Sequence, residues 1–274
     1  MTLLAVWYQE DTLFLAADTR LSMPGTSNGI LRLTDHGVKL IPFSMSCYGP
    51  ATNGFFTELR LTRQFVLGYA GSSLVAQQTS LAMSVLLGNL VSNADSNFPS
   101  VQDIANLAAR LVQEYTTEVA QMYSDAQKAA TDCIIAGMCP QKNVVRVFKL
   151  VTKINENSQP PIQTTAEEIC SLKDLETPYL LGDTKAKSEL QSSLSGASSS
   201  TPLKALETMV HENTTADTVG GGVQFGWILG GNYQPVSLCR GNPATFLNLG
   251  FDLTDLAPTS TLNGWITGGP GYAG

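Results

Sequence analysis

The order of the predicted elements indicates an α+β fold with a four-layer αββα arrangement, in which helices pack outside a pair of central sheets. Two features of the sequence carry this prediction. Apolar runs separated by short polar turns, typical of β-hairpins, occur at the start of the chain and again in residues 132–150. Segments with the helical spacing of apolar residues follow the strands twice, so sheets and helical pairs alternate along the chain.

The first hairpin is predicted at the N-terminal end. Residues 3–8 and 12–20 are mostly apolar, and the short polar stretch between them predicts a turn. Residues 21–29 are rich in turn-forming types and predict a loop. Residues 37–43 then predict another strand, which contains Lys39.

Two helices are predicted in the middle of the chain. Residues 65–71 predict a strand, and Ser72 can cap a helix over residues 74–91. Ser100 and Asp103 are typical of a capping box at the start of a second helix. The predicted buried face of this helix has apolar residues at steps of three and four, namely Ile104, Ala108, Leu111, Tyr115, Val119 and Met122.

The second half of the chain is predicted to repeat this alternation. Its predicted elements are a hairpin of residues 132–137 and 144–150, strands up to residue 169 and at 179–182, helices at 184–194 and 203–212, and a strand that ends at residue 229. The final residues are rich in Gly, Pro and Thr. We therefore expect residues 1–235 to form one domain and residues 236–274 to form a C-terminal extension, either a tail or an interface arm.

The composition excludes several classes of function. The net charge is −7, with 16 Lys and Arg against 23 Asp and Glu, so the chain lacks the basic surface that a nucleic-acid partner requires. No apolar run is long enough to span a bilayer, and residues 1–8 lack the basic start of a signal peptide. The five scattered cysteines indicate neither a zinc site nor a disulfide framework, and favour a reducing cytoplasm. We expect no membrane, metal or cofactor.

The N-terminal region combines residue types that suit a hydrolase. Thr2 becomes the first residue once Met1 is removed, and its free α-amine, with an ordinary pKa of about 7.7 to 8.0, can act as the base for its own hydroxyl. A nearby Lys39 cation would lower that pKa and stabilise the alkoxide. Asp18 would hold Lys39, and Arg20 would orient Asp18 through a forked contact.

Five short stretches also occur in a characteristic order, mostly at predicted strand ends. They are Met1-Thr2, Ala16-Ala17-Asp18-Thr19-Arg20, Val38-Lys39-Leu40-Ile41, Tyr69-Ala70-Gly71-Ser72-Ser73 and Ala216-Asp217-Thr218-Val219-Gly220-Gly221-Gly222. Together they resemble the proteasome β-subunit family of N-terminal nucleophile (Ntn) hydrolases. The resemblance covers roughly residues 2 to 230. Among bacterial forms without a long propeptide, the chain's length favours the Anbu-type homologues over the HslV peptidase.

The resemblance implies a role for each matched residue. Thr2 falls at the nucleophile, and Asp18 and Lys39 fall at the aspartate and lysine that activate it. Arg20 falls at the basic residue two positions beyond that aspartate. Gly71 falls at the glycine whose backbone N–H forms the oxyanion hole for a tetrahedral intermediate.

Three further places in the sequence comprise one match to the family pattern and two departures from it. Asp217 falls at a later aspartate near the threonine amine. Where the family has a Gly-Ser-Gly stretch, this chain has Gly182-Asp183-Thr184, so Asp183 or Thr184 is the candidate substitute for the serine. Gly220 stands where a second serine is expected.

The implied function is a threonine-type endopeptidase that hydrolyses peptide bonds through an acyl-enzyme on Thr2, within a ring or helical homo-oligomer. The implied partners are further copies of the chain, peptide or unfolded-protein substrates, and an ATP-driven unfoldase. Charged residues make up 14% of the chain, below the roughly 25% of an average domain, which favours such burial of the exterior. Two alternatives stay open: an Ntn amidase acting on a small amide, and a catalytically inactive assembly subunit that keeps Met1, which the missing serines favour.

Overall fold

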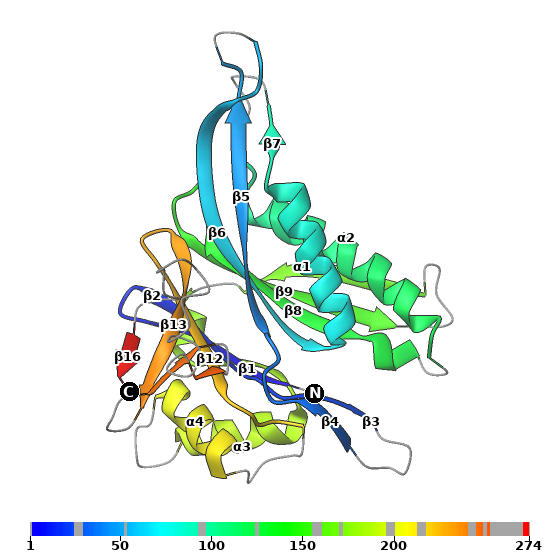
Figure 1. Ribbon diagram of the computed structural model, residues 1–274, viewed down its shortest axis with the longest axis vertical. Helices are drawn as coiled ribbons and strands as arrows, with labels where there is room; N and C mark the ends of the chain where they lie inside the picture. The colour runs from blue at the N-terminus through cyan, green and yellow to red at the C-terminus, as the bar shows by residue number, and fades with distance from the viewer. Residues whose placement is uncertain are drawn as a thin grey trace. The chain divides into compact units, whose positions relative to one another are not determined.

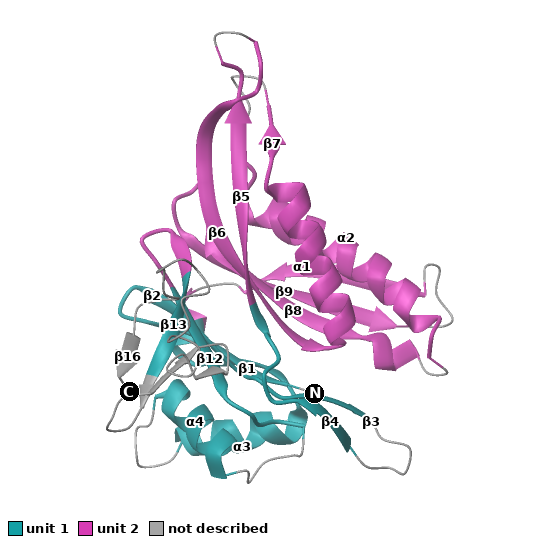
Figure 2. Ribbon diagram, in the orientation of Figure 1, with its two compact units in different colours: residues 1–40, 175–227, 234–274 teal, residues 41–174, 228–233 magenta. Residues whose placement is uncertain are grey.

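The computed structural model describes residues 2–24, 30–51, 54–92, 97–123, 126–154, 161–169, 172–195, 201–212, 218–240, 245–248, 251–252 and 271–273. The chain divides into two compact units (Figure 2). Unit 1 comprises residues 1–40, 175–227 and 234–274, and unit 2 comprises residues 41–174 and 228–233. Each unit combines β-sheet with a pair of α-helices, so the predicted α+β class is confirmed.

Unit 1 is built on an eight-stranded sheet (Figure 1). Its elements are β1 (Leu3–Gln9), β2 (Thr12–Asp18), β3 (Leu21–Pro24), β4 (Ile30–Thr34), β11 (Tyr179–Gly182), α3 (Thr184–Ser195), α4 (Pro202–Glu212), β12 (Val223–Leu229), β13 (Asn232–Arg240), β14 (Thr245–Asn248), β15 (Phe251–Asp252) and β16 (Gly271–Ala273). The turn between β12 and β13, with the strand residues next to it, belongs to unit 2 as residues 228–233. The strand order is β11-β1-β2-β12-β13-β14-β15, and β16 pairs with β13. Strands β3 and β4 form a separate two-stranded sheet.

The predicted N-terminal hairpin is confirmed. Strands β1 and β2 pair antiparallel, with Leu4 opposite Ala17 and Gln9 opposite Thr12. Glu10 and Asp11 form the turn with φ values of 49° and 60°, the left-handed backbone that a two-residue type I′ turn requires. This turn fixes the register, and the register brings the end of β2 beside the start of β1.

One face of the central strands of unit 1 packs on the helices α3 and α4. The buried cluster takes alternate residues from the strands, because successive side chains of a strand point to opposite faces. Its members include Leu3, Ala5, Ala16, Val223 and Phe225 from the strands and Ala186, Leu190, Leu203, Leu206 and Met209 from the helices.

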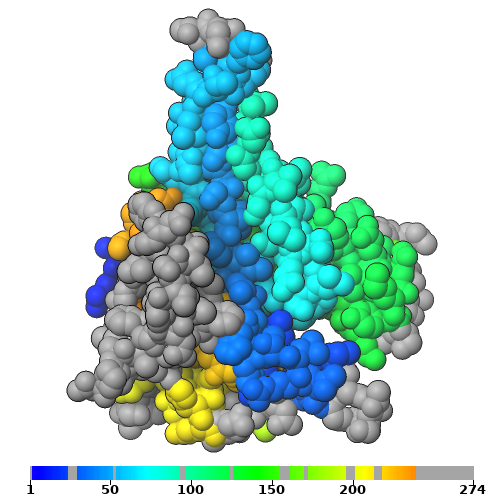
Figure 3. Space-filling view, viewed as in Figure 1, coloured from blue at the N-terminus to red at the C-terminus, as the bar shows by residue number. Residues whose placement is uncertain are grey.

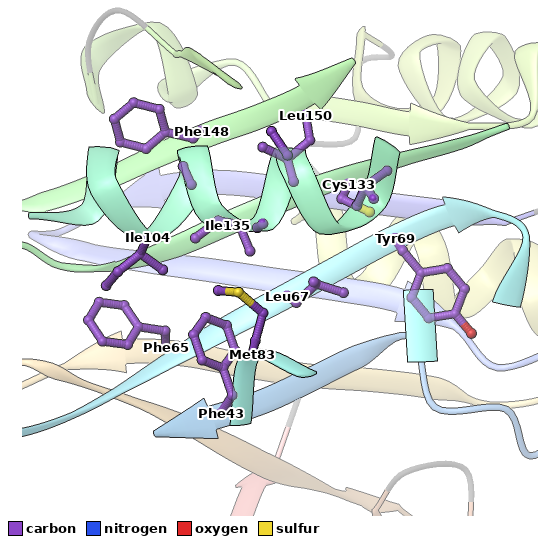
Figure 4. Packing of buried hydrophobic residues seen from close by; sticks show 14 of the residues in the cluster. Phe43, Phe65, Leu67, Tyr69, Met83, Ile104, Cys133, Ile135, Phe148 and Leu150 are labelled. Carbon is purple, nitrogen blue, oxygen red and sulfur yellow. The ribbon is translucent and has the colours of Figure 1, made fainter. Parts of the chain in front are cut away.

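Unit 2 is built on a six-stranded sheet in the order β10-β9-β8-β6-β5-β7. Its elements are β5 (Leu40–Gly49), β6 (Glu58–Gly71), α1 (Ser73–Leu87), β7 (Leu90–Val91), α2 (Val101–Ala120), β8 (Thr131–Met138), β9 (Val145–Ile154) and β10 (Ile162–Glu168), with short 3₁₀ segments at Ala126–Ala129 and Leu172–Glu176, the second of which continues into unit 1. Helices α1 and α2 supply Met83 and Ile104 to a buried cluster with side chains of β5, β6, β8 and β9 (Figure 4).

The helix starts of unit 2 were correctly predicted from their caps. The Ser72 hydroxyl accepts a hydrogen bond from the Val75 N–H, at 3.4 Å. Ser100 and Asp103 form the predicted capping box: the Ser100 Oγ accepts from the Asp103 N–H at 3.2 Å, and the Asp103 carboxylate accepts from the Ser100 N–H at 2.8 Å. These caps involve residues at most three positions apart, so they can be recognised in the sequence. The predicted helix starts therefore agree with the observed ones.

Other boundaries were wrong. Residues 21–24, predicted as loop, form β3 because they pair with β4, a partner that local turn propensity does not reveal. Helix α1 ends at Leu87 instead of residue 91, since Leu90 and Val91 pair with β5. Met122 lies beyond the end of α2 and is 75% exposed, so it does not belong to the buried face.

Two further differences from the predicted elements concern Lys39 and the C-terminal part of the chain. Strand β5 begins at Leu40, so Lys39 lies directly before the strand and not within it. Strand β13 was missed, and it runs across the predicted domain boundary between residues 235 and 236. The signal for it was present, because Gly230 and Gly231, with φ of 60° and 89°, form the tight turn that joins it to β12. Most of the predicted extension lies outside the described residues.

None of the helices in the described part of the chain combines the length and the apolar character that crossing a bilayer requires.

Candidate functional site

A buried ion pair lies near the N-terminal end of β1. The Lys39 Nζ donates to the Asp18 Oδ1 at 2.8 Å, and both side chains have an exposed fraction of 0%. Lys39 comes from the segment before β5, and Asp18 is the last residue of β2. The predicted contact between these two residues is therefore present in the structure.

The Asp18 carboxylate is fully hydrogen-bonded. Its Oδ1 also accepts from the backbone N–H of Leu3 at 2.8 Å, and its Oδ2 accepts from the N–H groups of Gly220 at 3.1 Å and Arg20 at 3.3 Å. Four donors from four parts of the chain fix this carboxylate, which a buried charge requires. Because Leu3 directly follows Thr2, Asp18 also holds the backbone next to the predicted nucleophile.

Burial lowers the pKa of Lys39 from its ordinary value, because removal from water disfavours the charged ammonium. The Asp18 carboxylate opposes this effect by attraction, and the Arg20 cation adds to it by repulsion. The charge state of Lys39 therefore depends on the geometry of its contact with Asp18.

Arg20 contacts Asp18 through its backbone, while its guanidinium holds neighbouring segments. The Arg20 Nε donates to the Asp35 Oδ1 at 2.9 Å, and the Nη1 donates to the Val219 carbonyl at 3.3 Å. The N–H of Arg20 also donates to the Gly220 carbonyl at 3.0 Å. Arg20 thus joins the end of β2 to the segments around residues 35 and 220.

Glycines are required in the run Gly220-Gly221-Gly222 before β12, because atoms of neighbouring residues approach its backbone closely. Gly220, with φ of +156°, lies where a Cβ would come within 2.4 Å of the Arg20 Cζ. Gly221, with φ of +78°, lies where a Cβ would come within 2.6 Å of both the Thr19 Oγ1 and the Asp35 carbonyl oxygen. Side chains at these positions would push the run away from Asp18. The glycines therefore allow the backbone to reach the Asp18 carboxylate, and are more than a flexible entry to the strand.

Thr19 is a site residue that sequence reasoning missed. Its Oγ1 accepts from the Gly222 N–H at 2.6 Å and donates to the Asp35 carbonyl, and its own carbonyl accepts from the Gly37 N–H at 2.7 Å. In the sequence Thr19 stands between two charged residues, but only the structure shows that it is 0% exposed and that its buried hydroxyl therefore needs partners. Thr19 therefore links two segments through its hydrogen bonds: residues 35–37, which lead to Lys39, and the glycine run.

Thr2 pairs with the end of β11. Its carbonyl accepts from the Asp183 N–H at 2.8 Å, next to the pairing of Leu3 with Gly182. Thr2 is 2% exposed, so a substrate reaches its hydroxyl only where the residue becomes more exposed than it is here. Met1 lies outside the described residues.

The Asp183 side chain caps helix α3. Its Oδ1 accepts from the Ala186 N–H at 3.0 Å, and its Oδ2 accepts from the Thr218 hydroxyl at 3.4 Å. A carboxylate at a helix N-terminus is favoured by the free N–H groups there. Asp183 therefore contacts Thr2 through its backbone and uses its side chain for the helix, while Thr184 is the first residue of that helix.

Two further predicted residues are Asp217 and Gly71. Asp217 lies outside the described residues. Gly71 belongs to unit 2, where it has φ of +121° and a Cβ would come within 2.3 Å of the Ala130 carbonyl oxygen, so its own surroundings require glycine. Within the described ranges no three His, Cys, Asp or Glu side chains form a group that could hold a metal.

Comparison with known proteins gives the fold. No family model matches the sequence, and no curated protein is similar enough to match. Among solved structures, Anbu (ancestral beta-subunit) from Yersinia bercovieri superposes with a TM-score of 0.51, at 17% identity, over 85% of this chain and 82% of that chain. The chain has the Anbu fold. The resemblance to Anbu-type proteins that the sequence indicated is thus confirmed at the level of fold.

Two other Anbu structures are similar at a lower score. The Anbu Gly-1 mutant from Hyphomicrobium sp. strain MC1 gives a TM-score of 0.48 at 16% identity, over 82% of this chain and 80% of that chain. The helical assembly of the Anbu complex from Pseudomonas aeruginosa gives 0.48 at 17% identity, over the same shares of the two chains.

Proposed function

We propose that this Anbu-like chain is a threonine-type peptidase whose nucleophile is Thr2 after removal of Met1. The observation that carries the proposal is the buried Asp18–Lys39 pair, which is tied through Asp18 to the N–H of the residue after Thr2. Burying two charges costs several kcal/mol per ion before their attraction is counted, and apolar residues often serve stability equally well. A chemical role therefore accounts for this pair better than a stabilising one.

The reaction follows from these groups. The neutral α-amine of Thr2 accepts the hydroxyl proton while Oγ1 attacks the carbonyl carbon of the substrate peptide bond. The leaving amine takes that proton as the tetrahedral intermediate collapses, which leaves an ester on Thr2. Water, deprotonated by the same α-amine, attacks the ester and releases the acyl group as an acid. Lys39 lowers the pKa of the α-amine and stabilises the Thr2 oxyanion.

The other matched residues have supporting roles in this proposal. Arg20 keeps the Asp18 carboxylate in place through its backbone N–H, and Asp183 holds the Thr2 carbonyl through its own. Asp217 acts near the Thr2 amine, and the Gly71 N–H is the oxyanion donor. These last two roles rest on the sequence resemblance alone.

We further propose that the chain self-associates in the cytoplasm and that its two sheets form the central layers of the αββα sandwich. Support for association comes from helix α1, which carries no charged residue and exposes Leu74, Leu81, Val85 and Leu86 by 44% to 78%. The segment that contains α1 lies at the surface in turquoise in Figure 3. Support for a reducing compartment comes from Cys47, Cys133 and Cys139, which are buried free thiols. Peptide or unfolded-protein substrates and an ATP-driven unfoldase remain the proposed partners.

The first experiment is the intact mass of the natively expressed protein, followed by labelling with a threonine-directed electrophile. We expect loss of one methionine, labelling of Thr2, and turnover of a peptide panel that Thr2→Ala and Lys39→Ala abolish while the assembly persists. Turnover of small amides alone would identify an amidase. A stable assembly that keeps Met1 and takes no label would identify the inactive subunit, and retained turnover in either variant would contradict the mechanism.

A further inference from the structure

We propose that Gln224 of β12 is a positioning residue for Lys39, because its side-chain amide fixes the backbone at Lys39 and Leu40 and so places the lysine against Asp18. The inference rests on the proposed function, since it assigns Gln224 a part in arranging the proposed catalytic lysine.

Two hydrogen bonds join Gln224 to this backbone. Its Oε1 accepts from the N–H of Lys39 at 2.6 Å and from the N–H of Leu40 at 2.9 Å, and both bonds are buried. The facing atom has to be the oxygen, because an amide nitrogen would present hydrogens to two donors. One oxygen thus fixes two consecutive residues.

The place of Lys39 in the chain explains why its N–H needs a side-chain acceptor. Lys39 is the last residue before β5 begins at Leu40. Its N–H lies outside the strand and is buried, so it requires an acceptor from elsewhere. Gln224 supplies that acceptor at the junction from which the Lys39 side chain extends to Asp18.

Most of the buried side chains on the sheet face that carries Gln224 are apolar. Its neighbours Val223 and Phe225 point into the cluster with α3 and α4, so Gln224 lies on the opposite face of the sheet. That face carries fully buried Leu4, Val6, Leu13, Leu15 and Ala17 from β1 and β2. A glutamine that is 2% exposed is unexpected in such a setting.

The nitrogen of the Gln224 side-chain amide lowers the stability of the fold. Within the described residues the Gln224 Nε2 has no hydrogen-bond partner, and an unpaired buried donor lowers stability. Packing would favour an apolar residue of the same length. The acceptor oxygen is the feature that accounts for glutamine at this position.

The consequence concerns the 2.8 Å contact between the Lys39 Nζ and Asp18. Asp18 is fixed by its own donors, whereas the start of the Lys39 side chain is fixed by Gln224. A displacement of about 1 Å at a reacting centre can reduce a rate about 10²-fold. Loss of the Gln224 oxygen is therefore expected to reduce kcat and leave KM unchanged.

The test compares Gln224→Met with Gln113→Met in the full-length protein. Gln113 is a matched control, because its Oε1 also accepts a backbone N–H, that of Thr164 at 3.0 Å, on α2 of unit 2. Hydrogen exchange is followed at the amides of Lys39 and Leu40, and kcat and KM are measured on a peptide substrate. In Gln224→Met we expect faster exchange at both amides and a kcat reduced by about 10²-fold. In Gln113→Met both readouts stay at wild-type values.

A rescue variant separates positioning from packing. Gln224→Glu keeps an acceptor oxygen, so exchange at both amides should return to the wild-type rate and kcat should exceed that of Gln224→Met. Unchanged exchange in Gln224→Met, or faster exchange with an unchanged kcat, would overturn the proposal. Should Gln224→Met fail to fold, Gln224→Leu, which also removes the acceptor oxygen, takes its place in both measurements. A wild-type protein without turnover contradicts the proposed function, and exchange at the two amides still decides whether Gln224 fixes the backbone.

Discussion

Gly182 lies directly against the carbonyl oxygen of Thr2. A Cβ at position 182 would come within 1.7 Å of that oxygen, and the φ of Gly182 is +114°. Since the carbonyl belongs to the backbone, no side-chain movement can relieve the clash. Only glycine allows β11 to pair with β1 at the point where Thr2 and Asp183 meet.

We therefore predict that Gly182→Ala lowers the free energy of unfolding by about 3 kcal/mol or more, from backbone strain and from the lost pairing. The control is Gly230→Ala, where φ is +60° and no atom of the described residues lies within 4 Å of the added carbon, so the cost is about 1 to 2 kcal/mol. Urea unfolding of both variants measures the difference. Equal costs would show that the contact with Thr2 does not constrain this position.

Removal of the Lys39 charge should be costly because Asp18 remains buried. We predict that Lys39→Met lowers the free energy of unfolding by about 3 to 5 kcal/mol, the usual cost of an uncompensated buried charge. The double variant Asp18→Asn with Lys39→Met should recover part of this loss, because no charge is then left unpaired. Denaturant unfolding of wild type and the variants tests this, and a double variant less stable than Lys39→Met would contradict it.

The lowered pKa of Lys39 predicts a pH dependence of stability. Between the pKa of Lys39 in the folded state and its ordinary value of 10.5, the unfolded chain binds more protons than the folded one. The free energy of unfolding contributed by this group therefore rises with pH across that window. We expect the stability difference between wild type and Lys39→Met to grow as the pH rises toward 10.5, because other titrating groups are common to both proteins. A difference that is flat or falls with pH would contradict the direction of the shift.

The sequence predicted those parts of the fold that local patterns determine. The β1–β2 hairpin, the caps of α1 and α2, and the β8–β9 hairpin all depend on residues close together in the chain. Strand β3 was missed because its stability comes from pairing with β4. Strand β13 was missed, despite the glycine pair before it, because the residues after it are rich in glycine and proline and the whole segment was assigned to an extension. Local propensity cannot report a partner that lies elsewhere.

The candidate site shows the same division. The pairing of Asp18 with Lys39 was predicted, because a buried lysine needs a carboxylate and the motif order supplied one. The roles of Thr19 and Gln224 could not be predicted, since their partners lie 16 and 185 residues away in the chain. Asp183 or Thr184 was predicted to replace a serine beside Thr2, and the helix was predicted to start at residue 184, as it does, but the use of the Asp183 side chain as its cap was not inferred.

The exposed face of α1 provides a test of self-association. Leu74, Leu81 and Val85 recur at steps of seven and four on this uncharged helix, so they lie on one side of it. We predict that Leu81→Glu combined with Val85→Glu reduces the assembled fraction at least tenfold, because two charges would have to be buried in the contact. Val144→Glu is the control, since Val144 is 48% exposed just before β9. Analytical ultracentrifugation measures the assembled fraction, and circular dichroism establishes that the variants fold. Assembly of the α1 variant at the wild-type level would exclude this helix as a contact and move the search to the exposed residues of β4, Ile30, Leu31 and Leu33.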